Sequence, residues 1–273
     1  MRLHPLVARA WQTSAMLAFT VVALKGGVGK TTVTLGLAES AARRGLRVLV
    51  VDLDPQANAT LGLDPPEVRF TTSDVIADAR DGIAADAVTA SGWGQGVDLI
   101  AAEPALEHRN RPGDAASALR LRRALRGVAD DYDLVLMDCP PSLGEITRNG
   151  LAAGTHAVVV TEPGYFALAG AEQALDAVTV VRDNANLRLR ALGIVVNRMR
   201  STVSEHKYRL HELEQAYPSL LVRPPIPERS VIQRSEGAGV PFRANGRAGA
   251  AVGAMFDTVF TELYGRAQTG VKR

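Results

Sequence analysis

The stretch from Leu24 to Thr32 (LKGGVGKTT) combines glycines, lysines and threonines in a spacing that can bind phosphate. Glycines let backbone N–H groups close around phosphate oxygens. Lys30 can then reach the β- and γ-phosphates of a nucleotide, and the Thr31 hydroxyl can ligate Mg²⁺. An apolar run over residues 17–23 precedes the stretch and predicts a buried strand, and residues 33–44 predict a helix. A helix N-terminus adds partial positive charge, so this strand–turn–helix context predicts a phosphate-binding loop.

Carboxylates end two further predicted strands. Residues 47–53 (RVLVVDL) form a near-continuous apolar run, typical of a parallel strand buried on both faces, and bring Asp52 and Asp54 to its end. Residues 132–138 (YDLVLMD) end in Asp138 and lead into CPPSLG, where the proline pair makes a stiff loop. Ligands of open α/β sheets bind at the carboxyl ends of parallel strands, so we expect these carboxylates beside the phosphate loop. Asp52 could instead cap the turn that follows it.

These motifs together resemble those of a known family. KGGVGKT matches the deviant Walker A motif KGGxGK[ST], and Leu24 stands where the generic phosphate loop has a glycine. DLDPQAN is similar to the family segment DxDPQGN, with Ala57 where glycine is usual, and DCPPSLG resembles its Walker B and switch II segments. The chain resembles the ParA/MinD group of ATPases, and more closely the ParA (Soj-like) partition proteins. The resemblance covers about residues 17–265 and is most specific through residue 170.

The resemblance implies ATP and Mg²⁺ as cofactors and assigns a role to each motif residue. Asp54 would position the attacking water, and Lys25 would cross to the partner subunit's phosphates in a face-to-face dimer, acting with Lys30 on the reacting phosphates. Mg²⁺ would be held by Thr31, Asp52 and Asp138. Nucleotide-binding residues would be Lys25, Gly26, Gly27, Val28, Gly29, Lys30, Thr31 and Thr32, with Asn197 at the adenine edge, and Pro227.

The amide of Asn197 suits the paired donor and acceptor of an adenine edge. From the residues alone, Asn197 could instead cap the turn after its strand.

Positive charge gathers late in the chain. Residues 188–247 contain eleven Lys and Arg against five Glu and no Asp, a local charge of +6 on a chain of net charge +2. This predicts a surface for a polyanion, although a solvated surface with clustered charges is the alternative. Ile226-Pro227 followed by Ser235-Glu236 resembles the family's IPR…SEA segment with two extra residues between, which transfers the family's DNA contacts to Arg229 and Arg234.

Alternating apolar runs and helical patterns predict one α/β domain, a single P-loop domain with a mostly parallel central sheet and helices on both faces. Besides those named above, strands are expected at residues 97–101, 156–162 and 190–197, and helices at 115–128, from about 167 to 182, and at 248–264. In the predicted 115–128 helix, leucines 119, 121 and 125 would face inward and arginines 120, 122, 123 and 126 outward. Residues 1–16 are read as an N-terminal tail, 17–265 as the ATPase domain and 266–273 as a basic C-terminal tail.

Composition excludes several classes of protein. The single cysteine, Cys139, rules out a disulfide framework within the chain. No apolar run reaches the roughly 18 residues needed to span a bilayer, and the N-terminus lacks the pattern of a signal peptide. We therefore expect a cytoplasmic protein with no membrane partner, associated with the nucleoid if the resemblance holds.

The function implied by the resemblance is an ATP-dependent switch. It would dimerise with ATP, bind DNA non-specifically and be released on hydrolysis, driving the partition of a plasmid, a chromosome or another cargo. Its ATPase activity would be weak unless stimulated by a partner, a ParB-like centromere-binding protein or another cargo adaptor.

Two alternatives stay open. A MinD-like membrane-associated ATPase would need a C-terminal amphipathic helix, and residues 264–273 have few large apolar side chains for one. An ATP-dependent amide-forming synthetase on the same fold would need a pocket for a second substrate.

Overall fold

The computed structural model describes residues 17–94, 96–111 and 116–269. The predicted N-terminal tail, residues 1–16, lies outside this part of the chain, as do residues 270–273.

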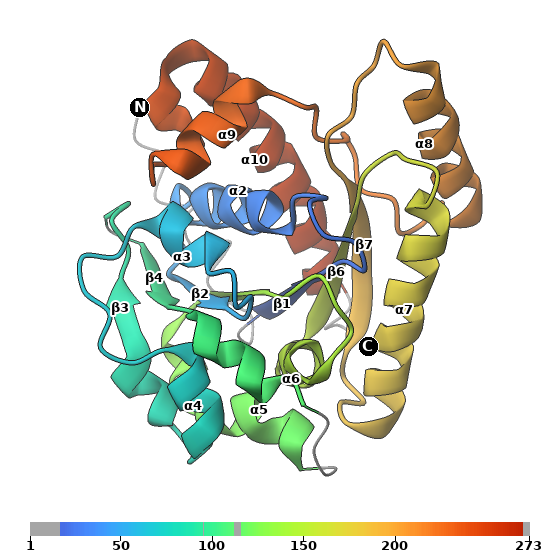
Figure 1. The fold of residues 1–273 in the computed structure, drawn as a ribbon. Coiled ribbons are helices and arrows are strands. Elements are labelled where there is room, and N and C mark those ends of the chain that lie inside the picture. Colours follow the sequence, from blue (N-terminus) through green and yellow to red (C-terminus); the bar gives the residue numbers. More distant parts are fainter. Residues whose placement is uncertain (1–16, 95, 112–115, 270–273) are drawn as a thin grey trace.

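A seven-stranded sheet forms the centre of the described chain, in the order β3-β4-β2-β5-β1-β6-β7 (Figure 1). Only the edge pair β3/β4 is antiparallel; the other neighbours are parallel. The predicted mostly parallel sheet is confirmed. Its strands are β1 (Leu17–Val22), β2 (Val48–Asp52), β3 (Val88–Ala90), β4 (Val97–Ile100), β5 (Leu134–Asp138), β6 (His156–Thr161) and β7 (Arg190–Val196).

Helices cover both faces of the sheet, as predicted (Figure 1). Alternate side chains of β1 enter two separate cores, because successive residues of a strand point to opposite faces: Phe19 joins one core and Ala18 the other. The first face carries α2 (Lys30–Ala42), α3 (Asn58–Leu63), α9 (Ser230–Gly237) and α10 (Gly246–Thr269). The second carries α4 (Thr72–Asp78), α5 (Arg120–Ala124), α6 (Glu145–Ala153) and α7 (Ala167–Asn184), with α8 (Ser204–Ala216) beside α7.

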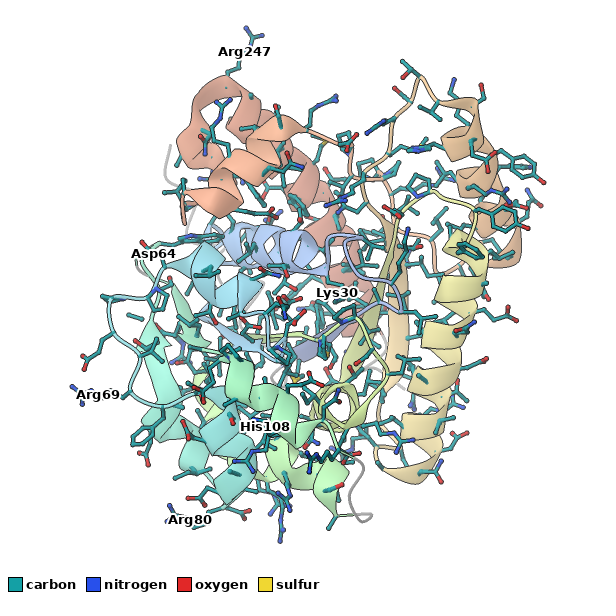
Figure 2. The ribbon with its side chains drawn as sticks, in the orientation of Figure 1. Lys30, Asp64, Arg69, Arg80, His108 and Arg247 are labelled. Carbon is teal, nitrogen blue, oxygen red and sulfur yellow. The ribbon has the colours of Figure 1, made fainter. Side chains whose placement is uncertain are left out.

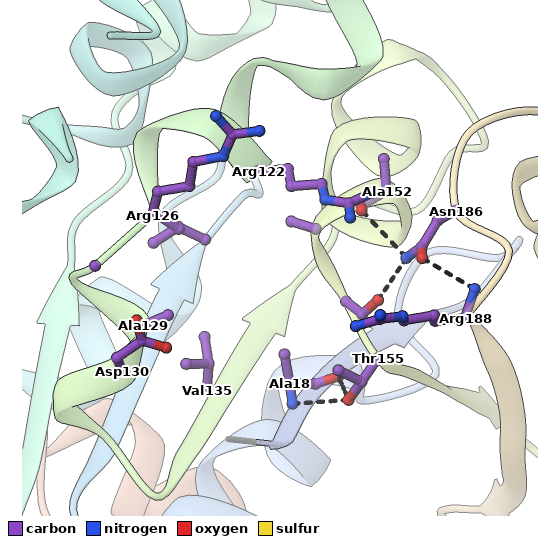
Figure 3. A pocket seen from close by; sticks show the side chains of 14 residues that line it. Ala18, Arg122, Arg126, Ala129, Asp130, Val135, Ala152, Thr155, Asn186 and Arg188 are labelled. Atoms are coloured by element: carbon purple, nitrogen blue, oxygen red, sulfur yellow. Dashed lines mark hydrogen bonds between the residues drawn. The ribbon is translucent and has the colours of Figure 1, made fainter. Parts of the chain in front are cut away.

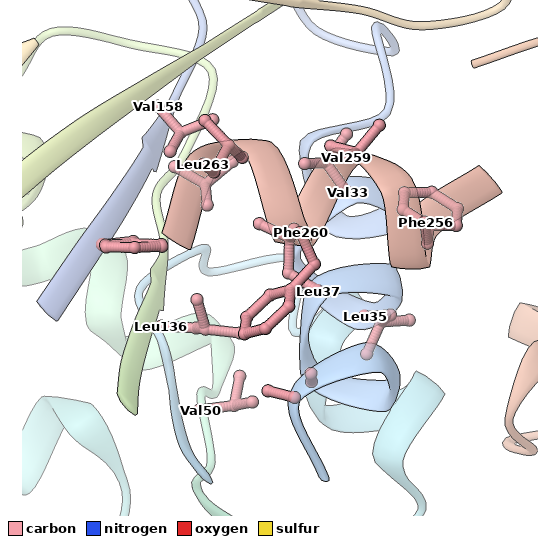
Figure 4. Packing of buried hydrophobic residues seen from close by; sticks show 14 of the residues in the cluster. Val33, Leu35, Leu37, Val50, Leu136, Val158, Phe256, Val259, Phe260 and Leu263 are labelled. Atoms are coloured by element: carbon pink, nitrogen blue, oxygen red, sulfur yellow. The ribbon is translucent and has the colours of Figure 1, made fainter. Parts of the chain in front are cut away.

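The helix that follows the phosphate loop, α2, is held tightly by α10. Phe256, Val259, Phe260 and Leu263 of α10 pack over α2 and the sheet (Figure 4). Gly36 permits this approach, because a Cβ there would lie 2.3 Å from the Phe256 ring. The beginning of α2 therefore rests on a rigid support.

Polar contacts reinforce that packing at the far end of α2. Arg44 forms an ion pair with Asp257 of α10 (3.0 Å), and the buried Glu39 accepts the backbone N–H groups of Phe242 and Arg243 (3.1 and 3.2 Å).

The prediction of a helix over residues 115–128 is wrong in its extent. Instead of a continuous helix over residues 115–128, the described residues form a 3₁₀ turn at Ser117–Leu119 and the five-residue α5. At the start of α5 the Leu121 N–H donates to the Asn149 side chain of α6 (3.1 Å) and not to a carbonyl of the preceding turn, and Gly127, with a left-handed φ of 76°, follows its end. The predicted facing still holds for Leu121 and Leu125, which are buried, and for the four arginines, which are exposed.

The C-terminal helix is longer than predicted and runs to Thr269. The first four residues of the predicted C-terminal tail are therefore helical. Arg266 donates to the carbonyls of Leu192 and Leu220, and Ala267 is buried. None of the described helices is both long and apolar enough to cross a bilayer.

The pattern did not assign β3, α3, α4, α6, α8 or α9 as separate elements, nor the 3₁₀ turns at residues 104–109, 129–131 and 242–245.

Candidate functional site

The phosphate loop lies between the central strand β1 and the start of α2. Gly27 and Gly29 have φ of 80° and 88°, a conformation that glycine adopts without strain. Gly29 is also closely packed, since a Cβ there would lie 2.0 Å from the Asn197 amide nitrogen. Lys30 opens α2 near the middle of the molecule and is only 6% exposed (Figure 2). Backbone N–H groups, a helix N-terminus and a buried lysine together form a cradle suited to phosphate.

Two fully buried aspartates lie directly beneath this loop. Asp52 and Asp138 face each other across β2 and β5, in the same register. Asp138 accepts hydrogen bonds from the hydroxyls of Thr31 (2.6 Å) and Thr34 (3.0 Å). Asp52 accepts the N–H and the hydroxyl of Thr60, both at 2.8 Å. The predicted Mg²⁺ residues Thr31, Asp52 and Asp138 are thus brought together from three separate segments.

The surroundings of the two aspartates disfavour their charged forms. Burial raises the pKa of Asp52, and the charge of Asp138 raises it further. Burial also raises the pKa of Asp138, although the Thr31 hydroxyl and the Lys30 charge lower it. When both are ionised, the two carboxylates outnumber the single positive charge of Lys30, so a divalent cation beside them would favour their charged forms.

Hydroxyl and carboxylate oxygens are ligands that Mg²⁺ prefers, so this donor set fits the ion. Among the described residues there is no group of three or more His, Cys, Asp or Glu side chains able to hold a metal. Mg²⁺ is usually bound through one or two carboxylates together with phosphate oxygens and water, and Asp52 and Asp138 supply two carboxylates here.

Asp54 lies close to the aspartate pair and is 6% exposed. Its carboxylate accepts the Gln56 N–H (3.0 Å), and its own N–H donates to Asp52 (3.0 Å). The turn continues into Ala57, whose φ of 54° is left-handed. The left-handed conformation costs a non-glycine residue about 1–2 kcal/mol, which explains why a glycine suits this position.

Lys25 extends to the neighbouring strand end rather than lying over its own phosphate loop. Its ammonium forms an ion pair with Glu162, just after β6, and its side chain is 63% exposed. Tyr165 and Phe166 follow Glu162 and are 72% and 69% exposed. The Arg209 guanidinium lies over the Tyr165 ring (5.0 Å). Two exposed aromatic side chains thus lie near Lys25, at the end of β6.

Asn197 and Pro227 lie at the other side of the phosphate loop. The Asn197 amide donates to the carbonyl of Val28 (2.9 Å), so in this structure it contacts the loop itself. Pro227 is paired with Met199 in an isolated bridge next to the end of β7. Their roles toward adenine stay predictions.

The structure separates the free cations of the basic region from those that are neutralised. Arg200, Arg209 and Arg223 form ion pairs with glutamates of the same region, and Arg243 pairs with Glu39 and Asp257. Within the described chain, the cations of this region without an ion pair are Arg188, Arg190, Arg198, Lys207, Arg229, Arg234 and Arg247.

Arg229 and Arg234 are exposed and belong to α9 or its N-cap. Arg247, near the start of α10, projects outward at the edge of the molecule (Figure 2).

Four contacts of the site were not predicted from the sequence, those of Thr34, Thr60, Glu162 and Glu236. Thr34 follows Lys30 by one helical turn, so a polar residue on the buried face of that helix was an available signal. Glu236 belongs to the Ser235-Glu236 pair that resembles part of the family's IPR…SEA segment, yet no pattern indicated its partner. Its carboxylate accepts the Thr32 hydroxyl (2.5 Å), and burial raises its pKa while this hydrogen bond lowers it.

A separate pocket of about 390 Å³ lies at the opposite ends of the strands (Figure 3). Arg122, Arg126 and Arg188 line it above an apolar floor that includes Val135. None of the predicted site residues lines this pocket.

The chain is similar to known proteins in sequence and in fold. Residues 16–191 match the family model described as "AAA domain". Over 223 residues the chain is 33% identical to the sporulation initiation inhibitor protein Soj of Bacillus subtilis, an alignment that covers 80% of this chain and 87% of that protein. It is 42% identical over 172 residues to the chromosome-partitioning ATPase Soj of Thermus thermophilus, covering 63% of this chain and 65% of the relative.

One similar solved structure is that of an ATP-binding synthase. The cobyrinic acid a,c-diamide synthase of Mycobacterium smegmatis, with bound ADP and magnesium, superposes with a TM-score of 0.76 at 26% identity, covering 94% of this chain and 97% of that one.

Proposed function

This chain belongs to the ParA/Soj family of P-loop ATPases, and we propose that it is an ATP-gated switch that binds DNA as a dimer and releases it on hydrolysis. The resemblance inferred from KGGVGKT, DLDPQAN and DCPPSLG is confirmed at the level of the family. The observation that carries the proposal is the site at the carboxyl ends of β1, β2 and β5, where a phosphate loop lies above a buried aspartate pair.

ATP with Mg²⁺ is the cofactor of this site. Lys30 and the backbone of the phosphate loop would bind the phosphates, and Thr31 with Asp138 and Asp52 would hold the ion, which would supply positive charge beside the phosphates and the aspartate pair. Asp54 is buried beside that pair and orients the attacking water. Support comes from the oxygen donor set and from the ADP and magnesium bound to the Mycobacterium smegmatis structure.

In the proposed ATP-bound dimer, Lys25 contacts the phosphates bound to the partner subunit. A lysine that is 63% exposed and already turned away from its own loop is free to reach a second subunit once its ion pair with Glu162 opens. A cation delivered in this way stabilises the charge that develops on the transferred phosphoryl group. The exposed Tyr165 and Phe166 supply apolar surface for the same contact.

DNA binding is assigned to α9 and its surroundings. Arg229 and Arg234 are exposed and make no ion pair within the described residues, so they are available to phosphates. Two such surfaces in a dimer double the number of contacts, and non-specific affinity then depends steeply on salt. A ParB-like protein or another cargo adaptor is the partner proposed to stimulate hydrolysis and define the cargo.

An ATP-dependent synthetase is the second candidate, supported by the 26% identity to the Mycobacterium smegmatis synthase. Its mark would be ATP turnover that depends on a small carboxylic acid and an amide donor but not on DNA. A MinD-like membrane role has less support, because the apolar side of α10 is buried in the core.

The proposal is tested by binding to a non-specific duplex with ATP, with ADP and without nucleotide, across a salt series. We expect tight binding with ATP only, weakening steeply as salt rises. In the double variant Arg229→Glu, Arg234→Glu the log–log salt slope should become shallower by about 2 per protomer, since each phosphate contact contributes about 0.9.

Arg120→Glu is the matched control, because Arg120 is exposed on α5, on the face of the sheet opposite α9, and makes no ion pair within the described residues. Binding that is absent in every nucleotide state, or lost equally in the control, would refute the assignment to α9.

A further inference from the structure

The helix α9 is bonded directly to the phosphate-loop helix. The Thr32 hydroxyl, in the first turn of α2, donates to the Glu236 carboxylate of α9 at 2.5 Å, across 204 residues of sequence. Asn245 also donates to Ser235 Oγ (2.8 Å), which fixes the inner side of α9. The same short helix carries Arg234 and begins after Arg229. A charged group of α9 thus lies at the edge of the phosphate cradle.

A second contact links α9 to the segment that follows Asp52 and Asp54. The Trp93 indole N–H donates to the carbonyl of Gly62, in α3, at 2.8 Å and to that of Gly239 at 3.0 Å. Gly239 follows α9 by two residues. Both sides of the nucleotide site, the phosphate loop and the segment after β2, therefore contact α9 or its end.

The charge of Glu236 conflicts with an anion in the cradle. The N-terminal turn of α2 directs its N–H groups and its positive dipole end toward the loop, an arrangement that favours negative ligands. A carboxylate within hydrogen-bond distance of Thr32 uses that hydroxyl and adds a negative charge of its own. Like charges at such short range disfavour each other, so Glu236 opposes an anion in the cradle for as long as α9 stays in this position.

We propose that Glu236 couples occupancy of the phosphate loop to the position of α9. The inference rests on the proposed function for the role of α9 in DNA binding. Without nucleotide, the Thr32–Glu236 hydrogen bond holds the helix in place. Phosphates in the loop repel the carboxylate, so α9 leaves this position and its arginines become competent for DNA. Because coupling between two sites is reciprocal, DNA on α9 also tightens nucleotide binding.

The decisive variant is Glu236→Gln, which removes the charge but keeps an oxygen that can accept the Thr32 hydroxyl. Glu228→Gln is the matched control, since it neutralises an acid next to Arg229 that pairs with Arg200 and not with the phosphate loop. Without DNA, calorimetry should find nucleotide bound at least about fivefold more tightly by Glu236→Gln, the lower end of typical couplings, and unchanged in Glu228→Gln.

The ratio of DNA affinities with and without ATP gives the second readout. It should fall at least about fivefold in Glu236→Gln, because ATP no longer releases α9 and DNA binding with ATP weakens. In Glu228→Gln both affinities should rise together and leave the ratio unchanged. A parental ratio together with a parental nucleotide affinity in Glu236→Gln would overturn the coupling while leaving DNA binding itself established.

Hydrogen exchange over residues 230–237 separates the inference from the proposed function. We expect these amides of the parental protein to exchange faster with ATP than without, and those of Glu236→Gln to exchange slowly in both states, because the hydrogen bond to Thr32 remains and no charge is repelled. If that pattern appears in a protein that binds no DNA, the coupling stands and the DNA assignment falls. Exchange that is insensitive to nucleotide in the parental protein refutes the coupling directly.

Discussion

Replacing Asp138 with asparagine should stabilise the nucleotide-free protein while weakening its binding of Mg²⁺ and nucleotide. Asp138 is fully buried opposite Asp52. Its pKa is raised although the Thr31 hydroxyl and the Lys30 charge both favour the charged form, so burial outweighs these contacts. Each unit by which the pKa is raised costs about 1.4 kcal/mol of folding free energy at a pH where the group is ionised. Asparagine has no charge and avoids that cost.

The measurement is thermal unfolding without nucleotide at neutral pH, compared between the parent and Asp138→Asn. A gain of about 1.4 kcal/mol corresponds to a rise in Tm of about 3–6 °C for a domain of this size. Calorimetry should at the same time show Mg²⁺-dependent nucleotide affinity reduced by at least about 10-fold, as for other changes around a metal.

The pH dependence of the Tm difference between Asp138→Asn and the parent is a second test of whether the Asp138 charge is destabilising. A raised pKa means that the folded state binds more protons than the unfolded state, so Asp138 contributes its stability below the pKa of an exposed aspartate, about 3.9. That contribution is lost as pH rises through the raised pKa of the folded protein. The Tm advantage of Asp138→Asn should therefore be largest at neutral pH and shrink as the solution is acidified toward pH 4.

Asp257→Asn is the control, with the opposite expected sign. Asp257 pairs with both Arg44 and Arg243, so losing its charge should cost about 1–2 kcal/mol. If Asp138→Asn lowered the Tm as Asp257→Asn does, the hydrogen bonds from Thr31 and Thr34 would outweigh burial, and the reasoning would be refuted.

Three further changes test other parts of the site and its support. Lys30→Ala should abolish nucleotide binding by calorimetry, because the loop loses the cation that meets the phosphates; an unchanged affinity would remove Lys30 from that role. Asp54→Ala should still bind ATP and dimerise but not hydrolyse, so parental turnover would exclude Asp54 from orienting the water. Gly36→Ala should lower the Tm, because the new Cβ would lie 2.3 Å from Phe256 and overpacking costs about 1–3 kcal/mol. Gly265→Ala, also in a helix but with open space around it, should raise the Tm through a gain of about 0.5–1 kcal/mol, and a fall there would contradict the packing argument.

Local sequence determined the parts of this protein that short-range physics controls. Strand β1, the glycine turn and helix α2 follow from an apolar run, from residues that tolerate positive φ and from helical spacing, all within a few residues of one another. The same holds for the carboxylates at the ends of β2 and β5, since a parallel sheet brings its strand ends to one edge. These patterns were sufficient for the fold class and for the phosphate loop.

Local patterns failed where a distant partner competed with them. Residues 115–128 have helical spacing, but Asn149 of α6 accepts a backbone N–H of that segment, and only a short helix forms. Counting charges along the sequence likewise located the basic region, but it did not show which of its arginines are neutralised by ion pairs. Arg243 is neutralised by Glu39 and Asp257, which lie outside that region, whereas Arg229 and Arg234 are left exposed.

Only the tertiary structure decided which residues meet across the site. The strand order places β5 between β1 and β2, and this puts Asp138 opposite Asp52 and beneath Thr31. The Thr32–Glu236 hydrogen bond joins residues 204 positions apart. Spacing along a chain fixes contacts within one helix or strand, because the local backbone geometry is periodic. Contacts at long separation depend on the order and packing of whole elements, which the periodicity of a single segment does not encode.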